Sequence, residues 1–301
     1  MQFTDSHCHL DFTEFQHEFP QLLAQCQQQN ISRLIVPSVN PEHWQRVLSL
    51  ALQTKHPNNR TVEISCCLGI HPWFIILQDN LAHHNLSNSL PSNKSAKNLD
   101  LAHYEQQLTQ AVRKHSSTNA YNNIVAIGEC GIDVFKAKKN TESEQALNNS
   151  LNLQQAFFEM QLHIAKQNNL PVVVHHCQSH HLILPLLKKS TLSRAGVIHA
   201  FSGSYQQAKA YVDLGFKLGI GGTITYPRSK KTIHAVKRLP LSSLLLETDA
   251  PAMPPFGQQG LINTPLNLLT VFKALSTIRD ESEVIIAKQI ESNINELFFN
   301  R

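Results

Sequence analysis

Two histidines close to the N-terminus are the first side chains able to act together, in the run Asp5-Ser6-His7-Cys8-His9. The preceding residues, 3–6, predict a β-strand. Side chains alternate between the faces of an extended chain, so His7 and His9 point the same way and Cys8 points away. Two imidazoles placed in this way can hold one metal ion. The pair alone is only moderately specific, because the chain has 17 histidines.

Further along the chain, other metal-binding residue types follow short apolar runs with strand character. They are Glu129 after residues 124–128, His175 after 171–174, His199 after 196–198 and Asp249 after 244–248. In a parallel barrel the C-terminal ends of all strands meet at one rim, where barrel active sites are built. A single strand-end histidine is more often a surface or core residue, and Asp249 before Ala250-Pro251 also suits a helix cap. Six such residues at one end of five strands favour a shared metal centre.

The elements that must position these side chains alternate between strands and helices. Eight strands are predicted at 3–6, 32–36, 62–69, 124–128, 172–174, 197–200, 216–220 and 244–247. Helical periodicity covers 20–29, 41–55, 100–115, 151–168, 180–189, 205–214, 230–237, 265–276 and 281–299. Asn40 and Pro41 predict the N-cap and first residue of one helix. This alternation predicts an α/β protein, a (β/α)₈ TIM barrel spanning residues 1–301 as one domain. The alternative is a doubly wound sheet, which often carries a glycine-rich phosphate motif that is missing here.

Two polar segments interrupt the alternation of strands and helices. Residues 75–100 are rich in Asn, Ser, Leu and Lys and predict a long loop insertion after the third strand. Residues 136–150, rich in Lys and Asn, predict another loop after the fourth strand. Loops of this length are usually functional lids or disordered insertions, and the composition favours disorder.

Composition excludes several classes of protein. A hydrophobic content of 42% with 16% charged residues excludes a disordered chain, and no apolar run approaches the roughly 20 residues of a membrane span. A net charge of +4 is too small to indicate a histone-like binder. The six cysteines form no C-x-x-C pair, which favours reduced thiols. We expect a cytoplasmic protein, since no leader pattern precedes the first strand.

Several motifs together resemble the TatD family of metal-dependent hydrolases, which includes deoxyribonucleases. The motifs are Asp5-Ser6-His7-Cys8-His9-Leu10-Asp11, Gly69-Ile70-His71-Pro72, Gly128-Glu129-Cys130-Gly131-Ile132-Asp133, Gly196-Val197-Ile198-His199-Ala200-Phe201-Ser202-Gly203-Ser204 and Leu246-Glu247-Thr248-Asp249-Ala250-Pro251. The stretch 221–227, Gly-Gly-Thr-Ile-Thr-Tyr-Pro, is most similar to the YjjV-type branch. The resemblance runs from residue 3 to near the end of the chain.

This resemblance implies an amidohydrolase-type TIM barrel with up to two divalent cations. The ligands that it implies for the first cation are His7, His9, Glu129 and Asp249. Glu129 would bridge to a second cation, which His175 and His199 would complete.

One departure from the family pattern concerns the substrate. The family usually has Ser-Arg after the histidine of strand five, whereas His176-Cys177 follows His175 here. An arginine at this place could bind a phosphate through two hydrogen bonds, which a cysteine cannot do. Cys177 could act as a soft ligand, but buried packing is the favoured interpretation.

Mixed imidazole and carboxylate ligands suit Zn²⁺, Mn²⁺ or Co²⁺, with Mg²⁺ left open. A bound cation lowers the pKa of water toward about 7 and so supplies hydroxide at neutral pH. We expect Asp249, both ligand and base, and the bridging Glu129 to be the catalytic residues.

Further rim residues each allow two interpretations. His71 is expected in the pocket, as a substrate contact or in a structural hydrogen bond. Ser202 and Ser204 precede a helix and either bind an anion or simply cap it. Arg228, beside lysines 230–231, lies after strand seven, where barrels often bind phosphate, or else belongs to a solvated basic loop.

The function predicted from these features is a divalent-metal-dependent phosphodiesterase or deoxyribonuclease that acts on DNA ends or oligonucleotides through a metal-activated water. The modest net charge fits an enzyme that engages an end or a short single strand. One alternative is a hydrolase of a small amide, lactone or phosphoester. The other is a metal-binding protein without turnover.

Overall fold

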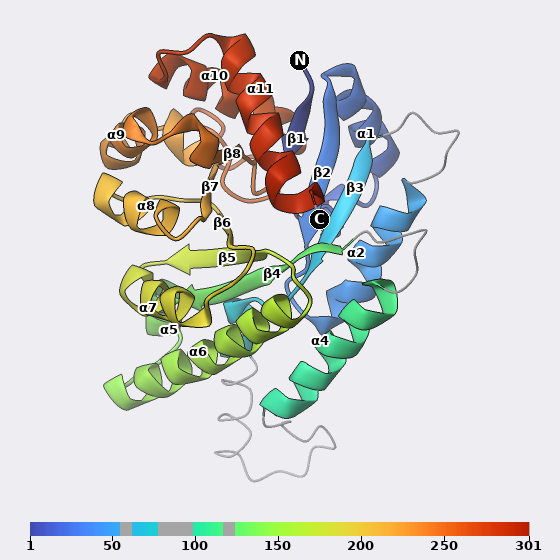
Figure 1. Cartoon of the computed structure of the whole chain (residues 1–301). Coiled ribbons are helices and arrows are strands. Elements are labelled where there is room, and N and C mark those ends of the chain that lie inside the picture. Colours follow the sequence, from blue (N-terminus) through green and yellow to red (C-terminus); the bar gives the residue numbers. More distant parts are fainter. Residues whose placement is uncertain (55–61, 78–98, 117–123, 301) are drawn as a thin grey trace.

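The structure, a computed structural model, describes residues 1–54, 62–77, 99–116 and 124–300. Its centre is one sheet of eight parallel strands in chain order, which confirms the predicted barrel (Figure 1). The strands are β1 (Phe3–Asp5), β2 (Ile31–Pro37), β3 (Glu63–Leu68), β4 (Ile124–Asp133), β5 (Val172–Cys177), β6 (Gly196–Ile198), β7 (Lys217–Ile220) and β8 (Leu244–Leu246).

Main-chain hydrogen bonds just beyond β1 and β8 close the barrel. The amide of Ser6 donates to the carbonyl of Leu246 over 3.0 Å, and the amide of His9 donates to Ala250 over 2.7 Å. A parallel bridge between Cys8 and Ala250 continues this pairing. The closure therefore brings the segment after the first strand against the segment after the last.

Helices surround the strands (Figure 1). They are α1 (Phe19–Gln28), α2 (Pro41–Gln53), α4 (Leu101–Ser116), α5 (Val134–Lys139), α6 (Glu144–Gln167), α7 (His180–Ser190), α8 (Tyr205–Val212), α9 (Lys230–Arg238), α10 (Leu268–Ile278) and α11 (Glu283–Ile294). Residues 72–77 are also helical. Asn40 caps α2 by accepting a hydrogen bond from the amide of His43, and Pro41 opens it, both as predicted. No helix in the described ranges is long and apolar enough to cross a membrane.

The barrel interior is apolar at the end where the strands begin. Val125, Val173 and Val197, each the second residue of its strand, belong to one buried cluster inside the sheet. Leu297 and Phe298, in the π-helical turn Asn295–Phe299 that follows α11, complete this cluster. The C-terminal segment therefore closes one end of the barrel, and the C-terminal strand ends remain for a polar site.

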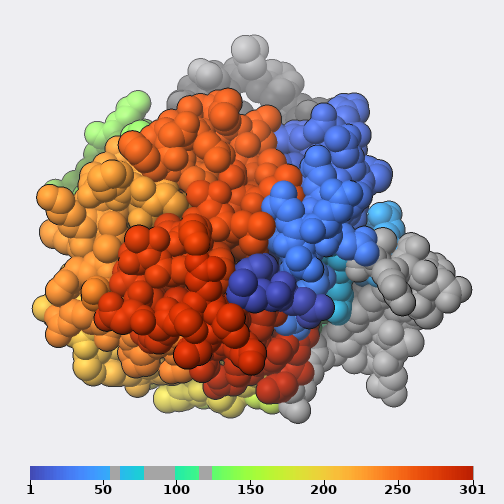
Figure 2. Space-filling model, turned by 90° about the horizontal axis from the view of Figure 1, so that it is seen from above, coloured from blue at the N-terminus to red at the C-terminus, as the bar shows by residue number. Residues whose placement is uncertain are grey.

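The first strand packs against the C-terminal helices α10 and α11. The ring centroids of Phe3 and Phe272 are 4.8 Å apart, and Thr4 donates a hydrogen bond to Glu291. Figure 2 shows the first residues lying against the C-terminal helices. This contact adds side-chain packing to the main-chain closure of the barrel.

The predicted loop at residues 136–150 is wrong. The segment holds α5 and the first two turns of α6. Asp133 and Ser143 cap these helices by accepting hydrogen bonds from the amides of Lys136 and Ala146. Only Ala137 and Ser150 are buried in this segment, so the polar composition hides the helical period. Of the insertion predicted at 75–100, residues 75–77 are helical, and 78–98 lie outside the described residues.

Candidate metal centre

A buried carboxylate fixes the segment after β1 against the segment after β8. Oδ1 of Asp5 accepts hydrogen bonds from the amides of His7 (3.1 Å) and Thr248 (3.0 Å), and the Thr248 hydroxyl donates to Oδ2 over 2.5 Å. Asp5 is fully buried, which raises its pKa to about 8. These bonds hold His7, His9 and Asp249 on neighbouring pieces of main chain.

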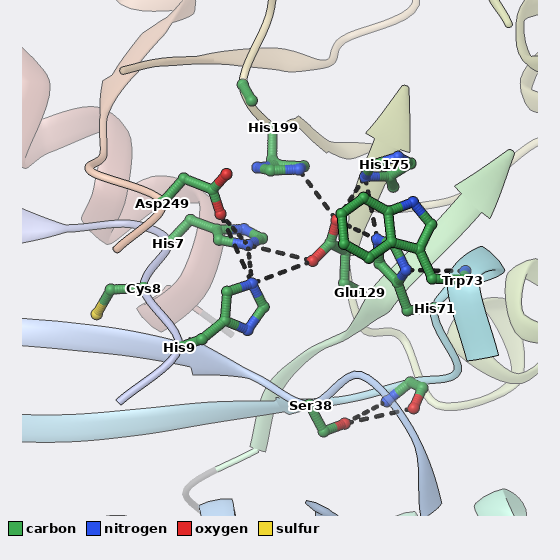
Figure 3. A network of polar contacts seen from close by, with 12 residues as sticks. His7, Cys8, His9, Ser38, His71, Trp73, Glu129, His175, His199 and Asp249 are labelled. Atoms are coloured by element: carbon green, nitrogen blue, oxygen red, sulfur yellow. Dashed lines mark hydrogen bonds and ion pairs between the residues drawn. The ribbon is translucent and has the colours of Figure 1, made fainter. Parts of the chain in front are cut away.

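The two N-terminal histidines turn toward the same point. Their Nε2 atoms are 3.2 Å apart, whereas Sγ of Cys8 lies 3.9 Å from the carbonyl of Ile35 on the other side of the chain (Figure 3). The alternation expected from the sequence is therefore present.

Glu129 lies within β4 rather than after it, which corrects one predicted strand boundary. β4 continues to Asp133 and pairs with β5 as far as Cys177, so His175 also lies inside its strand. The pairing shifts register between Ile127 and Cys130. Glu129 lies inside this irregular stretch, where side chains need not follow the simple alternation of a regular strand.

Four ligand atoms from three strand ends gather in a first group. Nε2 of His7 lies 3.2 Å from Oε2 of Glu129 and 3.6 Å from Oδ1 of Asp249. Nε2 of His9 lies 3.5 Å and 3.6 Å from the same two oxygens. Donor atoms arranged tetrahedrally at about 2.1 Å from a cation are about 3.4 Å apart. The observed separations therefore fit a cation held between the two imidazoles and a carboxylate, and His7, His9 and Asp249 form one such group.

The second carboxylate oxygen of Glu129 faces another group of histidines. Its Oε1 lies 2.8 Å from Nδ1 of His175, 3.0 Å from Nε2 of His199 and 3.1 Å from Nε2 of His71. In Figure 3 His7, His9 and Asp249 lie on one side of the Glu129 carboxylate and His71 and His175 on the other. The ring of His199 lies above the carboxylate and stacks on that of His7, with centroids 3.9 Å apart. The structure thus brings together all six predicted ligands, with His71 beside them.

Burial and neighbouring charges shift the pKa values of several groups in this cluster. Burial raises the pKa of Glu129, but His199, His71 and His7 lower it more, so this carboxyl has a pKa well below its usual range. Burial and His199 hold the pKa of His7 well below its usual value. Burial also raises the pKa of Asp249 to about 6. The Nδ1 atoms of His7 and His9 are buried without a hydrogen-bond partner among the described residues. Burial lowers the pKa of His199 and of His175, but Glu129 for the first and Asp133 with Glu129 for the second raise it more, so both pKa values lie above the usual range of histidine. A divalent metal requires neutral imidazoles, so its binding to these two side chains would release protons.

Two residues that the sequence analysis did not assign adjoin this cluster. The indole Nε1 of Trp73 donates to Oδ2 of Asp133 over 2.7 Å, and Nε2 of His175 is 3.1 Å from that same oxygen. Asp133 therefore orients His175 from behind, as outer-shell carboxylates orient metal-bound histidines. Trp73 directly follows the Gly-Ile-His-Pro motif, and Asp133 is the last residue of the motif that contains Glu129. These positions next to predicted site residues could have indicated both.

Glu247 is a further buried residue that sequence reasoning missed. Its Oε1 accepts a hydrogen bond from the amide of Ala200 and lies 3.5 Å from Nδ1 of His199. A Cβ atom on Gly219 would lie 2.0 Å from its carboxylate, so only glycine fits there. Glu247 therefore lies next to the ring nitrogen of His199 that faces away from Glu129, as Asp133 does for His175.

Within the part of the chain that the structure describes, the other predicted residues contact groups outside the histidine cluster. Ser204 caps α8 with a full capping box, the plainer of its two interpretations. Ser202 is exposed, and its hydroxyl is 3.4 Å from that of Thr232. The guanidinium of exposed Arg228 stacks 4.8 Å from the Tyr226 ring centroid. Cys177 lies beside Asp133, and burial raises its pKa to about 11, which disfavours a thiolate ligand.

Comparison with known proteins agrees with this site. A family model described as TatD related DNase matches residues 4–299. The chain is 36% identical over 297 residues to YjjV of Escherichia coli (strain K12), named a metal-dependent hydrolase, covering 99% of this chain and 98% of the relative. The crystal structure of that TatD homolog superposes with a TM-score of 0.79 over 99% of this chain and 98% of the other. A 3'-5' ssDNA/RNA exonuclease, TatD of Pantoea ananatis (strain LMG 20103), is 31% identical over 58% of this chain and 66% of its own length. The chain therefore belongs to the TatD related DNase family and is a metal-dependent hydrolase.

Proposed function

We propose that this chain cleaves phosphodiester bonds in single-stranded nucleic acid or oligonucleotides, working from an end, with two divalent cations. The observation that carries the proposal is the position of Glu129, whose two carboxylate oxygens face two separate groups of ligand atoms. Two cations bridged by one carboxylate are a recurrent arrangement in enzymes that cleave phosphate esters. The exonuclease name of the Pantoea relative supports the choice of a nucleic acid.

The proposed ligands divide between the two groups. The first is His7, His9 and Asp249 with Oε2 of Glu129, and the second is His175 and His199 with Oε1 of Glu129. Nitrogen and oxygen donors together favour Zn²⁺ or Mn²⁺, and Mg²⁺ is compatible with the carboxylates. Bound divalent cations lower the pKa of a water molecule and polarise a phosphoryl oxygen.

Asp249 is the proposed general base. Its side chain is 13% exposed, which makes it the most accessible carboxylate of the first group. As a carboxylate, Asp249 takes a proton from the attacking water and passes it to the leaving oxygen. Glu129 is buried between the histidines, stays ionised and connects the two ligand groups. Nε2 of His71 lies 3.1 Å from Oε1 of Glu129, and we propose that its N–H turns to a phosphate oxygen when substrate binds.

We also propose that Ser202, Ser204 and Arg228 bind the substrate at the outer rim of the barrel. Arg228 is exposed after β7 and can meet a phosphate there. Ser202 is also exposed. Ser204 contributes through the start of α8, because its own hydroxyl already accepts a hydrogen bond from the Gln207 amide.

The test is cleavage of an end-labelled single-stranded oligonucleotide by protein stripped of metal and reloaded with Zn²⁺, Mn²⁺ or Mg²⁺. We expect cleavage with at least one cation, two cations per chain by mass spectrometry, and fewer in His7→Ala and His175→Ala. Protein that is folded and loaded with metal yet cleaves the oligonucleotide with none of these cations would refute the nuclease proposal.

A second candidate is a hydrolase of small phosphoesters, lactones or amides. Cys177 favours it, because this position beside Asp133 offers no cation to a phosphate. A panel of small chromogenic substrates, assayed in parallel with the oligonucleotide, separates the two. Higher kcat/KM on a small ester than on any oligonucleotide would select the second candidate.

A further inference from the structure

Trp73 is an exposed aromatic side chain directly beside the metal centre. The chain has two tryptophans; Trp44 is buried, whereas Trp73 is 47% exposed. The Trp73 ring centroid lies 5.3 Å from that of His71 and 6.4 Å from that of His175 (Figure 3). A large indole surface is therefore open to solvent within contact of the site that we propose to cleave nucleic acid.

The orientation of this ring is set by buried partners. Its Nε1–H donates to Oδ2 of Asp133 over 2.7 Å, and the other oxygen of Asp133 accepts a hydrogen bond from the Lys136 amide over 2.7 Å. The main-chain amide of Trp73 donates to Nδ1 of His71 over 3.0 Å. A ring anchored at its edge cannot turn inward to bury its face. Its exposed face is therefore available to a flat apolar ligand at little cost in lost conformational freedom.

A cation accompanies the ring. Nζ of Lys136 lies over the Trp73 ring, 4.8 Å from its centroid. A base that stacks on this face takes the place of the ammonium group, which can then turn to the adjacent phosphate. An aromatic face next to an ammonium group is the combination with which proteins hold single-stranded nucleic acid, the ring under a base and the charge on a phosphate. Neither residue belongs to either proposed ligand group.

We propose that Trp73 is a stacking platform for the nucleobase next to the scissile phosphodiester, with Lys136 contacting an adjacent phosphate. This inference rests on the proposed nuclease function. It specifies the substrate of that nuclease as a strand in which the base can unstack from the neighbouring bases. A base inside a duplex is already stacked on both faces, so the platform favours single strands.

Phe135 and Lys139 provide a matched control. Phe135 is 44% exposed, and Nζ of Lys139 lies 4.4 Å from its ring centroid, so the pair has the same chemistry. Among the described ring contacts, Phe135 has none with the histidines of the site. Replacing it removes an exposed aromatic ring and leaves Asp133, His71 and His175 as they are.

The experiment compares two substrates across four proteins loaded with metal. The substrates are an end-labelled oligothymidylate and the same strand with abasic residues flanking the terminal scissile bond. The proteins are the wild type, Trp73→Leu, Trp73→Phe and Phe135→Leu. Wild type is expected to bind the intact strand between about fivefold and about 150-fold more tightly than the abasic strand. Trp73→Leu abolishes that ratio, Trp73→Phe keeps most of it, and Phe135→Leu leaves it unchanged.

Two other outcomes have distinct meanings. If Trp73→Leu weakens binding of the intact and abasic strands equally, Trp73 acts only by positioning Asp133, and the stacking proposal is overturned. If the wild type cleaves neither strand, the proposed nuclease function fails, and this inference fails with it. Quenching of tryptophan fluorescence by the intact strand adds an independent signal, because Trp44 is buried. An unchanged spectrum at saturation would also overturn the proposal.

Discussion

The main-chain N–H of Trp73 donates to Nδ1 of His71 over 3.0 Å, so Nδ1 of that imidazole is the acceptor. Burial lowers the pKa of His71 to about 4, and the ring is therefore neutral near pH 7. A neutral imidazole whose Nδ1 accepts carries its hydrogen on Nε2, which lies 3.1 Å from Oε1 of Glu129. Nε2 of His71 can therefore donate a hydrogen bond but offers no lone pair to a cation. This assigns His71 as a donor, although its position beside Glu129 and His175 also fits a candidate metal group.

His71→Ala tests this assignment. We expect kcat/KM to fall by about 10²–10³, the usual cost of losing one donor to developing charge, while the metal content of the protein is unchanged. Activity assays combined with metal analysis by mass spectrometry check both parts. Loss of one cation per chain in His71→Ala would instead make His71 a ligand.

Asp249→Asn tests the proposed base. The substitution keeps the shape of the side chain and removes the carboxylate, so we expect kcat to fall by about 10²–10⁴. In the wild type, kcat/KM is expected to rise as Asp249 loses its proton. This rise lies at or below about pH 6, because burial raises the pKa to about 6 and a neighbouring cation lowers it. A pH–rate profile that keeps this rise in Asp249→Asn would assign it to another group.

Asp5 controls the pH dependence of stability in protein stripped of metal. Its pKa is raised by burial to about 8 in the folded state, above its unfolded value of 3.8. The folded state therefore holds this proton more tightly, and its contribution to stability is lost as the pH rises from about 4 to about 8. A shift of this size corresponds to several kcal/mol, on the order of 1.4 kcal/mol per pH unit.

The isostere Asp5→Asn removes this titration. We expect urea unfolding of the metal-free variant to show a flatter dependence on pH than the wild type across the same range. The difference between the two proteins isolates Asp5 from the histidines that titrate nearby. Parallel pH curves for the two proteins would show that Asp5 does not carry this dependence.

Gly131 permits the close pairing that places His175 beside Glu129. It has φ +147°, and a Cβ atom there would lie 2.1 Å from the carbonyl oxygen of His175. We expect Gly131→Ala to lower the free energy of unfolding by about 2–4 kcal/mol through overpacking and backbone strain. Gly257, with φ +88° and nothing within 4 Å, is the control, and Gly257→Ala should cost about 1–2 kcal/mol. Equal unfolding midpoints for the two variants in urea would contradict this explanation.

All eight strands could be predicted from the sequence to within a few residues, except where β4 and β5 run past Glu129 and His175. The reason is local: strands buried on both faces are short apolar runs, of which Leu244–Leu246 is typical. The spacing of His7 and His9 and the strand-end positions of the other ligands also follow from the order of residues and strands. These features require no knowledge of which side chains meet across the barrel.

The helices at 136–150 could not be predicted, because only Ala137 and Ser150 of this segment are buried and its polar residues show no apolar period. Further along α6, the partners of polar side chains are also known only after folding. On α6, the side-chain oxygen of Gln154 accepts a hydrogen bond from the Asp133 amide, and Gln161 makes two hydrogen bonds with Ile70, 91 residues away. An asparagine or glutamine indicates little about secondary structure by itself, because what its side chain stabilises depends on the partner that folding supplies.

The sequence by itself therefore determined the barrel and the kinds of side chain gathered at its mouth, because periodicity and strand order are properties of the linear chain. Only the tertiary structure decided that Glu129 faces two groups of ligand atoms, that Trp73 holds Nδ1 of His71 and that Asp133 stands behind His175. Those relations depend on the distances between strands and on the burial that shifts each pKa. Both arise only when the barrel closes, so the order of residues does not specify them.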